Sequence, residues 1–256
     1  MSRRPMMVGN WKMNKSASEA TQLVQQLVNG YDRSFKAVDV VVCPPFTALR
    51  SVQVSLEFDN KSSIALGAQD VYWEPAGAYT GAISAGMLKD LNCSYCLVGH
   101  SERREYFLES DEQIALKVKA LVEADITPII CCGESLEQHQ QGSTNQFVVA
   151  QIEAALSHLQ AADGNDIVLA YEPIWAIGSG HTPLPEEADA VCLVLRDTCS
   201  RLYGSQAAET IRILYGGSMN LGNVESFCTL PNIDGGLVGG ASLKADDFLT
   251  LVKAVS

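Results

Sequence analysis

The sequence predicts an α/β protein, folded as a single-domain (β/α)₈ barrel that spans residues 1–256. Short apolar or β-branched runs alternate along the chain with longer segments of helical periodicity, as in parallel sheets whose strands are joined by helices. Eight such runs in 256 residues give about 32 residues per unit, the length of one strand–helix crossover unit. No Ser/Gly-rich linker, charge block or low-complexity stretch divides the chain, so we expect one domain.

The predicted strands are short, and several are apolar throughout, which is typical of strands buried on both faces. They are Met6–Gly9, Val38–Cys43, Ile64–Ala68, Tyr95–Gly99, Ile126–Cys132, Ile167–Ala170, Ile211–Leu214 and Gly236–Val238. Eight alternating units favour closure of the sheet into a barrel. An open doubly wound sheet is the alternative, but it usually carries a glycine-rich phosphate turn after its first strand. The first strand here ends in Gly9-Asn-Trp-Lys12, so we favour the barrel.

Three of the helical segments carry recognisable start signals. Ser16-Ala-Ser-Glu19 and Ser110-Asp-Glu-Gln113 have the capping-box pattern, and each precedes an apolar helical face. Pro185 stands near the start of a third helix, where its missing N–H costs nothing. Gly30 is expected to end the first helix, because glycine is favoured at helix C-termini.

The formal net charge of −12 restricts the partners that we expect. It argues against nucleic acid and against an anionic membrane. If the substrate is an anion, positive potential must be built locally, from one or two lysines and from backbone N–H groups.

The chain has no apolar run as long as the roughly 18 residues of a membrane span, and its N-terminal apolar part is too short for a signal peptide. We therefore expect a cytoplasmic protein whose eight cysteines are free. Cys93-Ser-Tyr-Cys96 could indicate a metal or redox site, but no second Cys or His pair stands at zinc spacing. We interpret the two cysteines as small residues beside a buried strand, and we expect no metal.

Polar residues follow several of the predicted strands. Asn10 and Lys12 follow the first strand, two residues apart and so on the same side. His100 follows the fourth strand, Glu134 the fifth and Glu172 the sixth. Gly216-Gly-Ser218 and Gly239-Gly240 follow the last two. In a barrel, the carboxyl ends of all strands meet at one mouth, where catalytic residues lie.

Each of these residues also has an ordinary interpretation. A single carboxylate or lysine is usually a solvated loop residue, a single histidine can be a helix cap, and a glycine pair is often only a turn. Together, however, the strand ends supply a base, an acid, a cation and a phosphate cradle. The combination favours an active site over unrelated loop residues.

The chain also resembles the triosephosphate isomerase family, from Pro5 to Val255. The resemblance is carried by Gly9-Asn-Trp-Lys-Met-Asn14, Val98-Gly-His-Ser-Glu-Arg-Arg104, Ala170-Tyr-Glu-Pro-Ile-Trp-Ala-Ile-Gly-Ser-Gly180, Tyr215-Gly-Gly-Ser-Met-Asn220 and Gly235-Gly-Leu-Val-Gly-Gly-Ala-Ser-Leu243. It implies an aldose–ketose isomerase of glycolysis and gluconeogenesis. The substrates would be dihydroxyacetone phosphate and D-glyceraldehyde 3-phosphate, which interconvert through an enediolate without a metal or organic cofactor.

The resemblance assigns the catalytic roles. Glu172 would be the base, and His100, at a helix start that disfavours a charged imidazole, would be the electrophile. Lys12 would supply positive charge, and Asn10 would hydrogen-bond the substrate oxygens. Glu102 resembles a buried acidic neighbour of the site, and we expect it to pair with Lys12.

Phosphate binding would fall to Gly178, Ser218, Gly239 and Gly240. The segment Gly240–Leu243 is also expected to begin the last helix. The run from Pro173 to Thr182 resembles a mobile lid, although by itself it could be an ordinary long loop.

The segments Gly67–Tyr72 and Gly77–Gly81 resemble a long loop that docks into a partner subunit, with Gln69 and Thr80 in it. The resemblance therefore implies a homodimer. A plain surface loop is the alternative, but an uncharged stretch with Tyr79 suits an interface better.

The chain departs from the family pattern near the lid and the dimer loop. His181 stands where the family usually has Lys, and Asp70 stands where it usually has Asn. Ala82 replaces a usual Glu, Ala85 a usual Pro and Cys132 a common Ile. None of these residues is expected to touch the chemistry, but lid behaviour and interface ion pairs could differ.

Two other functions stay open on the residues alone. Another phosphate-binding barrel, such as an aldolase or a tryptophan-pathway isomerase, is possible, but an aldolase needs a Schiff-base lysine at a strand end and Lys12 is the only candidate. A catalytically silent barrel could act as a binding or scaffold protein. Loss of Glu172, His100 or Lys12 would favour that interpretation, and all three are present.

Overall fold

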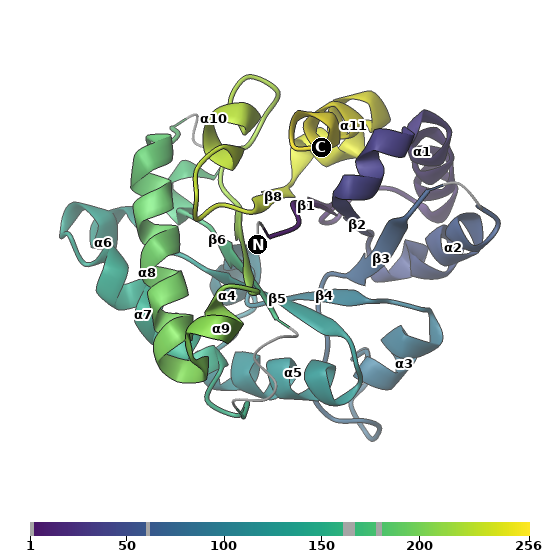
Figure 1. Cartoon of the computed structure of the whole chain (residues 1–256). Helices are drawn as coiled ribbons and strands as arrows, with labels where there is room; N and C mark the ends of the chain where they lie inside the picture. Colours follow the sequence, from purple (N-terminus) through teal and green to yellow (C-terminus); the bar gives the residue numbers. More distant parts are fainter. Residues whose placement is uncertain (1–2, 60–61, 161–166, 178–180) are drawn as a thin grey trace.

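The protein, represented by a computed structural model, forms a closed barrel of eight parallel strands in the order β1 to β8 (Figure 1). The structure describes residues 3–59, 62–160, 167–177 and 181–256. The strands are β1 (Met6–Asn10), β2 (Asp39–Cys43), β3 (Ile64–Ala68), β4 (Tyr95–Val98), β5 (Thr127–Cys132), β6 (Val168–Tyr171), β7 (Arg212–Tyr215) and β8 (Gly235–Val238). The predicted (β/α)₈ barrel is confirmed, and the predicted strands coincide with these to within one or two residues at each end.

Helices surround the barrel on all sides (Figure 1). The α-helices are α1 (Ala17–Gly30), α2 (Phe46–Glu57), α3 (Ala85–Asp90), α4 (Ser101–Tyr106), α5 (Asp111–Glu123), α6 (Leu136–Gln140), α7 (Thr144–Ala155), α8 (Pro185–Tyr203), α9 (Ser205–Ala208), α10 (Val224–Cys228) and α11 (Ala245–Ala254). Short 3₁₀ turns are η1 (Arg33–Ala37), η3 (Ile174–Ala176) and η4 (Gly240–Leu243).

The predicted helix starts are confirmed. Ser16 and Ser110 each cap a helix in a complete capping box, and Pro185 is the first residue of α8. Gly30 is the last residue of α1, as expected, but it does not have the positive φ of a glycine cap. A Cβ atom at Gly30 would instead lie 2.5 Å from Leu249 Cδ1, so a side chain there would displace the tip of Leu249 where α1 packs against α11.

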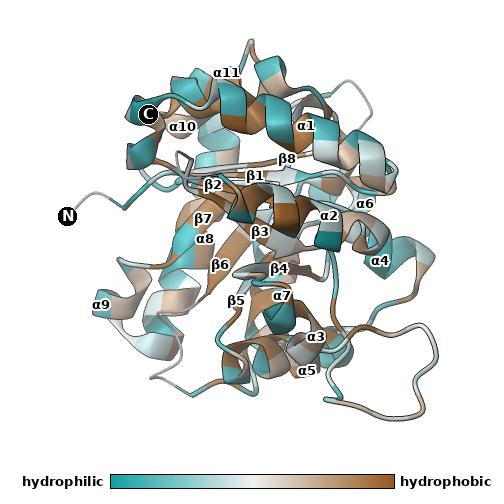
Figure 2. Ribbon diagram, turned by 90° about the vertical axis from the view of Figure 1, so that its right-hand side faces the viewer, coloured by the Kyte–Doolittle hydropathy of each residue, from teal (hydrophilic) through white to brown (hydrophobic). Residues whose placement is uncertain are grey.

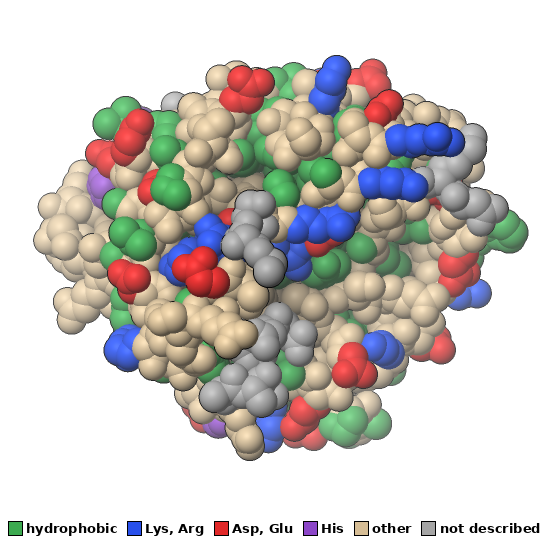
Figure 3. All heavy atoms as spheres, in the orientation of Figure 1, with side chains coloured by type: hydrophobic (Ala, Val, Ile, Leu, Met, Phe, Trp, Pro, Cys, Tyr) green, Lys and Arg blue, Asp and Glu red, His purple; other side chains and the backbone are tan. Residues whose placement is uncertain are grey.

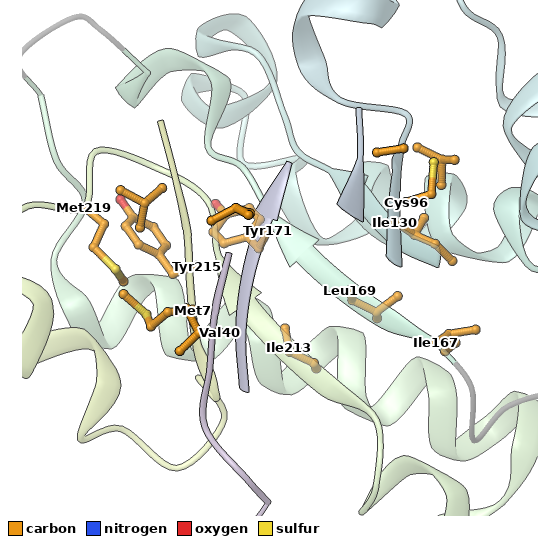
Figure 4. Packing of buried hydrophobic residues seen from close by; sticks show 14 of the residues in the cluster. Met7, Val40, Cys96, Ile130, Ile167, Leu169, Tyr171, Ile213, Tyr215 and Met219 are labelled. Carbon is orange, nitrogen blue, oxygen red and sulfur yellow. The ribbon is translucent and has the colours of Figure 1, made fainter. Parts of the chain in front are cut away.

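Side chains alternate between the inside of the barrel and the layer under the helices, because successive residues of a strand point to opposite faces. Val8, Val41, Leu97, Val168 and Leu214 belong to the buried cluster inside the barrel. The strand residues between them join the larger cluster that the helices cover, and Figure 4 shows part of it. Apolar colour accordingly concentrates on the strands and on the inner sides of the helices in Figure 2. A residue at the end of a strand therefore faces either the mouth of the barrel or the helices.

The C-x-x-C cysteines lie in this packed interior. Cys93 and Cys96 are buried and free, and burial raises the pKa of the Cys93 thiol to about 12. Among the described residues, no group of three or more Cys, His, Asp or Glu side chains could hold a metal ion. None of the described helices combines the length and the apolar character needed to cross a bilayer.

Candidate active site

The structure gathers the polar strand-end residues around one cavity at the carboxyl end of the barrel. The cavity has a volume of about 250 Å³. Its lining includes Asn10, Lys12, His100, Glu172, Ser218, Gly239 and Gly240, together with Ile177, Gly216, Gly217, Met219 and Leu237. Residues from β1, β4, β6, β7 and β8 thus meet at one point, as the barrel geometry requires.

Glu172 follows β6 and points into the mouth of the barrel, and only 2% of it is exposed. One carboxylate oxygen, Oε1, lies 3.0 Å from His100 Nε2, and the other accepts a hydrogen bond from the backbone N–H of Ser101 at 3.1 Å. Burial alone would raise the pKa of Glu172. The neighbouring imidazole, the Ser101 N–H and Lys12 outweigh burial and hold this pKa below its ordinary value.

His100 is the N-cap residue of α4, and its Nδ1 accepts a hydrogen bond from the backbone N–H of Glu102 at 3.2 Å. An Nδ1 that accepts a hydrogen bond carries no proton, which leaves the ring proton on Nε2, facing Glu172. Burial would lower the pKa of His100, but the carboxylate of Glu172 outweighs it and raises the pKa above its ordinary value. The helix start therefore favours the uncharged imidazole that the sequence predicts, whereas the carboxylate of Glu172 favours the protonated imidazole.

Lys12 has a left-handed backbone conformation, with φ at 52°. Two side chains hold its main chain in place: Asn10 Oδ1 accepts from the Lys12 N–H at 3.0 Å, and Gln69 Nε2 donates to its carbonyl at 2.9 Å. The Lys12 ammonium lies 2.6 Å from Glu102 Oε1, which is the pairing expected from the sequence. The expectation that Glu102 is buried is wrong, because 40% of its side chain is exposed.

Glycines shape the opposite wall of the cavity. A Cβ atom at Gly239 would lie 3.4 Å from Lys12 Cε, whereas one at Gly240 would meet nothing within 4 Å. The expectation that Gly240 begins the last helix is wrong in detail. Gly240–Leu243 forms the 3₁₀ turn η4, and α11 begins separately at Ala245. Ser218 lines the cavity, and its hydroxyl donates to the Ala176 carbonyl at 2.5 Å.

The expected lid, Pro173–Thr182, is only partly described. Residues 174–176 form η3, and Gly178 lies outside the described residues.

Glu134, which also follows a strand, faces away from the cavity. Its Oε1 accepts hydrogen bonds from Tyr171 Oη at 3.1 Å and from Trp175 Nε1 at 2.7 Å. Glu134 therefore anchors η3 and does not line the cavity.

Two glycines make room for Glu172: Gly133, which sequence reasoning missed, and Gly216, which it placed at the end of a strand without this role. A Cβ atom at Gly133 would lie 1.7 Å from the Glu172 carbonyl oxygen, and one at Gly216 would lie 2.8 Å from Glu172 Cγ. The signal for Gly133 in the sequence was that it directly follows a predicted strand. Of the two expected dimer-loop residues, Gln69 lies beside Lys12, whereas Thr80 is exposed and does not line the cavity.

Comparison with known proteins agrees with this geometry. The family model described as triosephosphate isomerase matches residues 5–255. The chain belongs to the triosephosphate isomerase family. The triosephosphate isomerase of Roseiflexus sp. (strain RS-1) is 51% identical over 251 residues, covering 98% of this chain and 97% of that protein. Those of Cutibacterium acnes and Lactobacillus delbrueckii subsp. bulgaricus are 48% and 44% identical, and each alignment covers at least 98% of both chains.

Membership of the triosephosphate isomerase family confirms the resemblance on which the sequence analysis drew. It does not favour the catalytically silent barrel that the residues alone left open. It also gives no support to the aldolase interpretation. The similar proteins are named triosephosphate isomerase, and the alignments cover nearly their whole length.

Proposed function

We propose that this chain is a triosephosphate isomerase that interconverts dihydroxyacetone phosphate and D-glyceraldehyde 3-phosphate, as a step of glycolysis and gluconeogenesis. The observation that carries the proposal is the meeting of a carboxylate, an imidazole and an ammonium around one cavity of about 250 Å³. Such a volume is large enough for a three-carbon phosphate. Family membership supports the same reaction.

In this mechanism Glu172 takes a proton from the carbon next to the carbonyl group, and an enediolate forms. The Nε2–H of His100 donates to the oxygen on which negative charge develops, and the imidazole moves a proton between the two oxygens. Glu172 then returns its proton to the neighbouring carbon, and no atom is gained or lost. Both groups line the same cavity, with His100 Nε2 3.0 Å from Glu172 Oε1, so one small substrate could reach both.

Lys12 and the glycine wall would hold the phosphate. The chain has a net charge of −12, so a dianion needs local positive potential. Lys12 supplies it, with Asn10 beside the same cavity. Ser218, Gly239, Gly240 and, by resemblance, Gly178 would contribute hydroxyl or backbone donors, and the glycines allow close approach.

A coupled assay tests the proposal directly. Purified protein is supplied with glyceraldehyde 3-phosphate, and formation of dihydroxyacetone phosphate is followed through a second enzyme. We expect turnover without added metal or cofactor. A protein that binds inorganic phosphate but gives no turnover would instead support the scaffold interpretation.

We also propose that the chain works as a homodimer. Large apolar side chains are exposed on the loop at residues 73–82, on the loop after β1 and just after α4: Tyr79 is 42% exposed, Met13 96% and Phe107 66%. The Tyr79 ring packs on Tyr72 at the start of this segment, with centroids 4.7 Å apart. A second cavity of about 260 Å³, lined by Met13, Phe107 and Lys12, could receive the partner's loop.

The free cysteines support a proposed location, and the surface charge supports the proposal that nucleic acid and membrane are not partners. A cytoplasmic location is supported by eight cysteines that form no disulfide. Acidic and basic side chains intermix on the face shown in Figure 3, which gives no support to a nucleic-acid or membrane surface.

A further inference from the structure

The η3 turn links the base to the phosphate side of the proposed site. It follows Glu172 after a single residue, Pro173. The carbonyl of Ala176 accepts a hydrogen bond from the hydroxyl of Ser218 at 2.5 Å, and Ile177 lines the cavity. A displacement of η3 would therefore move part of the cavity wall together with a side chain that is expected to bind the phosphate.

Side chains must help to hold η3, because the turn is short. It has three residues, and the hydrogen bonds of a 3₁₀ turn have poorer geometry than those of an α-helix. A backbone hydrogen bond from the Ile174 N–H to the Glu134 carbonyl, at 3.1 Å, ties its start to the end of β5. Trp175 is the largest side chain of the turn and is half-buried. The position of its indole ring therefore bears directly on the position of η3.

Glu134 fixes one edge of the indole ring. Its Oε1 accepts hydrogen bonds from Trp175 Nε1, at 2.7 Å, and from Tyr171 Oη, at 3.1 Å, and the residue is fully buried. A hydrogen bond is stronger in such surroundings than in water. It fixes only one atom of the indole, however, and the ring can still turn about the line between the nitrogen and the oxygen.

His139 covers one face of the same ring. The imidazole of this α6 residue stacks on Trp175, with ring centroids 4.4 Å apart and an angle of 28° between the planes. Its Nδ1 lies 3.7 Å from Glu134 Oε1, the atom that receives the indole N–H. A stacked ring opposes the rotation that the hydrogen bond allows. Edge and face of the indole are thus held by different residues.

Helix α6 is itself anchored, so His139 has a fixed base from which to act. Ser135 and Gln138 form a complete capping box at the start of the helix. The Gln138 carbonyl accepts from both the N–H and the hydroxyl of Ser143, each at 3.0 Å, which joins α6 to α7. The His139 side chain is 41% exposed, so its removal should leave the core intact.

We propose that His139 is a positioning residue for the reaction. It acts through Trp175: the stacked imidazole fixes η3, and η3 fixes the cavity wall at Ile177 and the hydroxyl of Ser218. The base is held separately, because Glu172 accepts its backbone hydrogen bond from the start of α4. The inference rests on the proposed isomerase function and adds to it a residue that lies outside the cavity.

The first test is His139→Ala, with Gln140→Ala as the matched control, because Gln140 is an exposed residue of the same helix. Alanine preserves the helix and removes the stacked ring. We expect the KM for glyceraldehyde 3-phosphate and the Kd of inorganic phosphate, measured by calorimetry, to rise about fivefold, with kcat within about twofold. The control should match the wild type. Unchanged affinity, or a fall in kcat as large as the loss of affinity, would overturn the inference.

Two further variants separate the stacked ring from the polar contact with Glu134. His139→Phe keeps a flat ring over Trp175 but has no polar atom beside the carboxylate, and it should restore KM and Kd to within about twofold of the wild type. His139→Gln keeps a polar group without the ring, and it should behave like His139→Ala. Any other ranking of these two variants would overturn the inference.

A double-mutant cycle tests whether His139 acts through Trp175. In a Trp175→Ala background, His139→Ala should cause no further loss of phosphate affinity. Additive losses would overturn the inference, and the comparison of His139→Phe with His139→Gln decides alone if Trp175→Ala does not fold. An inactive wild type would refute the proposed function. Phosphate affinity that His139→Ala leaves unchanged would refute only the role of His139, because calorimetry does not require turnover.

Discussion

Lys12 illustrates how single residues of the site are held in unfavourable states. Its left-handed backbone costs a non-glycine residue about 1–2 kcal/mol. Asn10 Oδ1, which accepts from the Lys12 N–H, and Gln69 Nε2, which donates to the Lys12 carbonyl, maintain this conformation. The result is an ammonium that lies between Glu102 and the glycine wall of the cavity. The strained backbone thus belongs to Lys12, the residue on whose positive charge binding of the phosphate dianion would depend.

We expect Lys12→Ala to weaken inhibition by inorganic phosphate about 100-fold, because the acidic chain has no other lysine lining this cavity among the described residues. Inhibition is measured in the coupled assay. Lys119→Ala, which removes an exposed lysine of α5, is the control and should leave inhibition unchanged. Equal inhibition of both variants would contradict the assignment of Lys12.

Glu172→Gln keeps the size of the side chain but removes the base. Proton transfer by a positioned base is worth about 10²–10⁴-fold, so kcat should fall by about 10³-fold while phosphate still inhibits. Initial rates and phosphate inhibition are measured on the same preparation. If kcat survives, another group is the base.

The His100–Glu172 pair also predicts a pH dependence of stability. The lowered pKa of Glu172 contributes stability above its unfolded value, near 4.5, and this is lost as pH falls through the folded pKa. The raised pKa of His100 contributes stability at pH values below the unfolded pKa, near 6.5, and this stability is lost as pH rises through the folded pKa. The pair should therefore stabilise most between about pH 4.5 and 6.5.

Urea unfolding at pH 5.5 and 8.5 checks this window. His100→Gln should reduce the free energy of unfolding more at pH 5.5 than at pH 8.5. His158→Gln, in which a solvent-exposed histidine changes, serves as the control. An equal loss at both pH values would mean that the pair does not share a proton in the folded protein.

Among the elements, β5 and β6 determine where the base stands. Gly133, just beyond β5, lies so close to the main chain of Glu172 that it has no room for a side chain. The next residue, Glu134, anchors η3 through Trp175. The two residues show that the ends of neighbouring strands position each other.

Gly133→Ala should destabilise the protein by about 3 kcal/mol, because the new Cβ would meet backbone atoms that no side-chain rotation can move. What remains folded should have a displaced Glu172 and a reduced kcat. Gly86→Ala is the matched control, since a Cβ there meets only Ser84 Oγ at 3.8 Å. Urea unfolding and the coupled assay measure both effects.

At the scale of the whole molecule, the exposed apolar residues next to the site require an explanation. Met13 and Phe107 lie on the surface beside Lys12, and Tyr79 is exposed on the loop at residues 73–82. A homodimer would cover them and would close one side of each active site.

Tyr79→Glu should therefore give monomers of 27.6 kDa at concentrations where the wild type sediments at about twice that mass. The barrel should stay folded by circular dichroism, because Tyr79 lies outside the core. Phe58→Glu replaces an aromatic residue that caps the end of α2 and is 83% exposed, and it should leave the mass unchanged. A monomeric wild type would refute the homodimer.

The sequence predicted some features of the site and missed others for identifiable reasons. The position of Glu172, His100 and Lys12 at strand ends was readable, because strand ends follow from local apolar patterns. The exposure of Glu102 and the 3₁₀ turn at Gly240 were not, because both depend on what packs against these residues. Asp70 was expected to matter only near the dimer loop, whereas its carboxylate binds cations of α4 and α5.

The sequence by itself determined the barrel, the family and the residues available for chemistry, since these depend on periodicity within a few residues and on short motifs. Apart from the expected Lys12–Glu102 pair, tertiary structure decided which of those residues touch. Gln69 and Lys12 are 57 positions apart, and Ser101 and Glu172 are 71 apart. The physical reason is that closure of the sheet and the packing of helices fix such contacts, and neither leaves a trace in the local sequence.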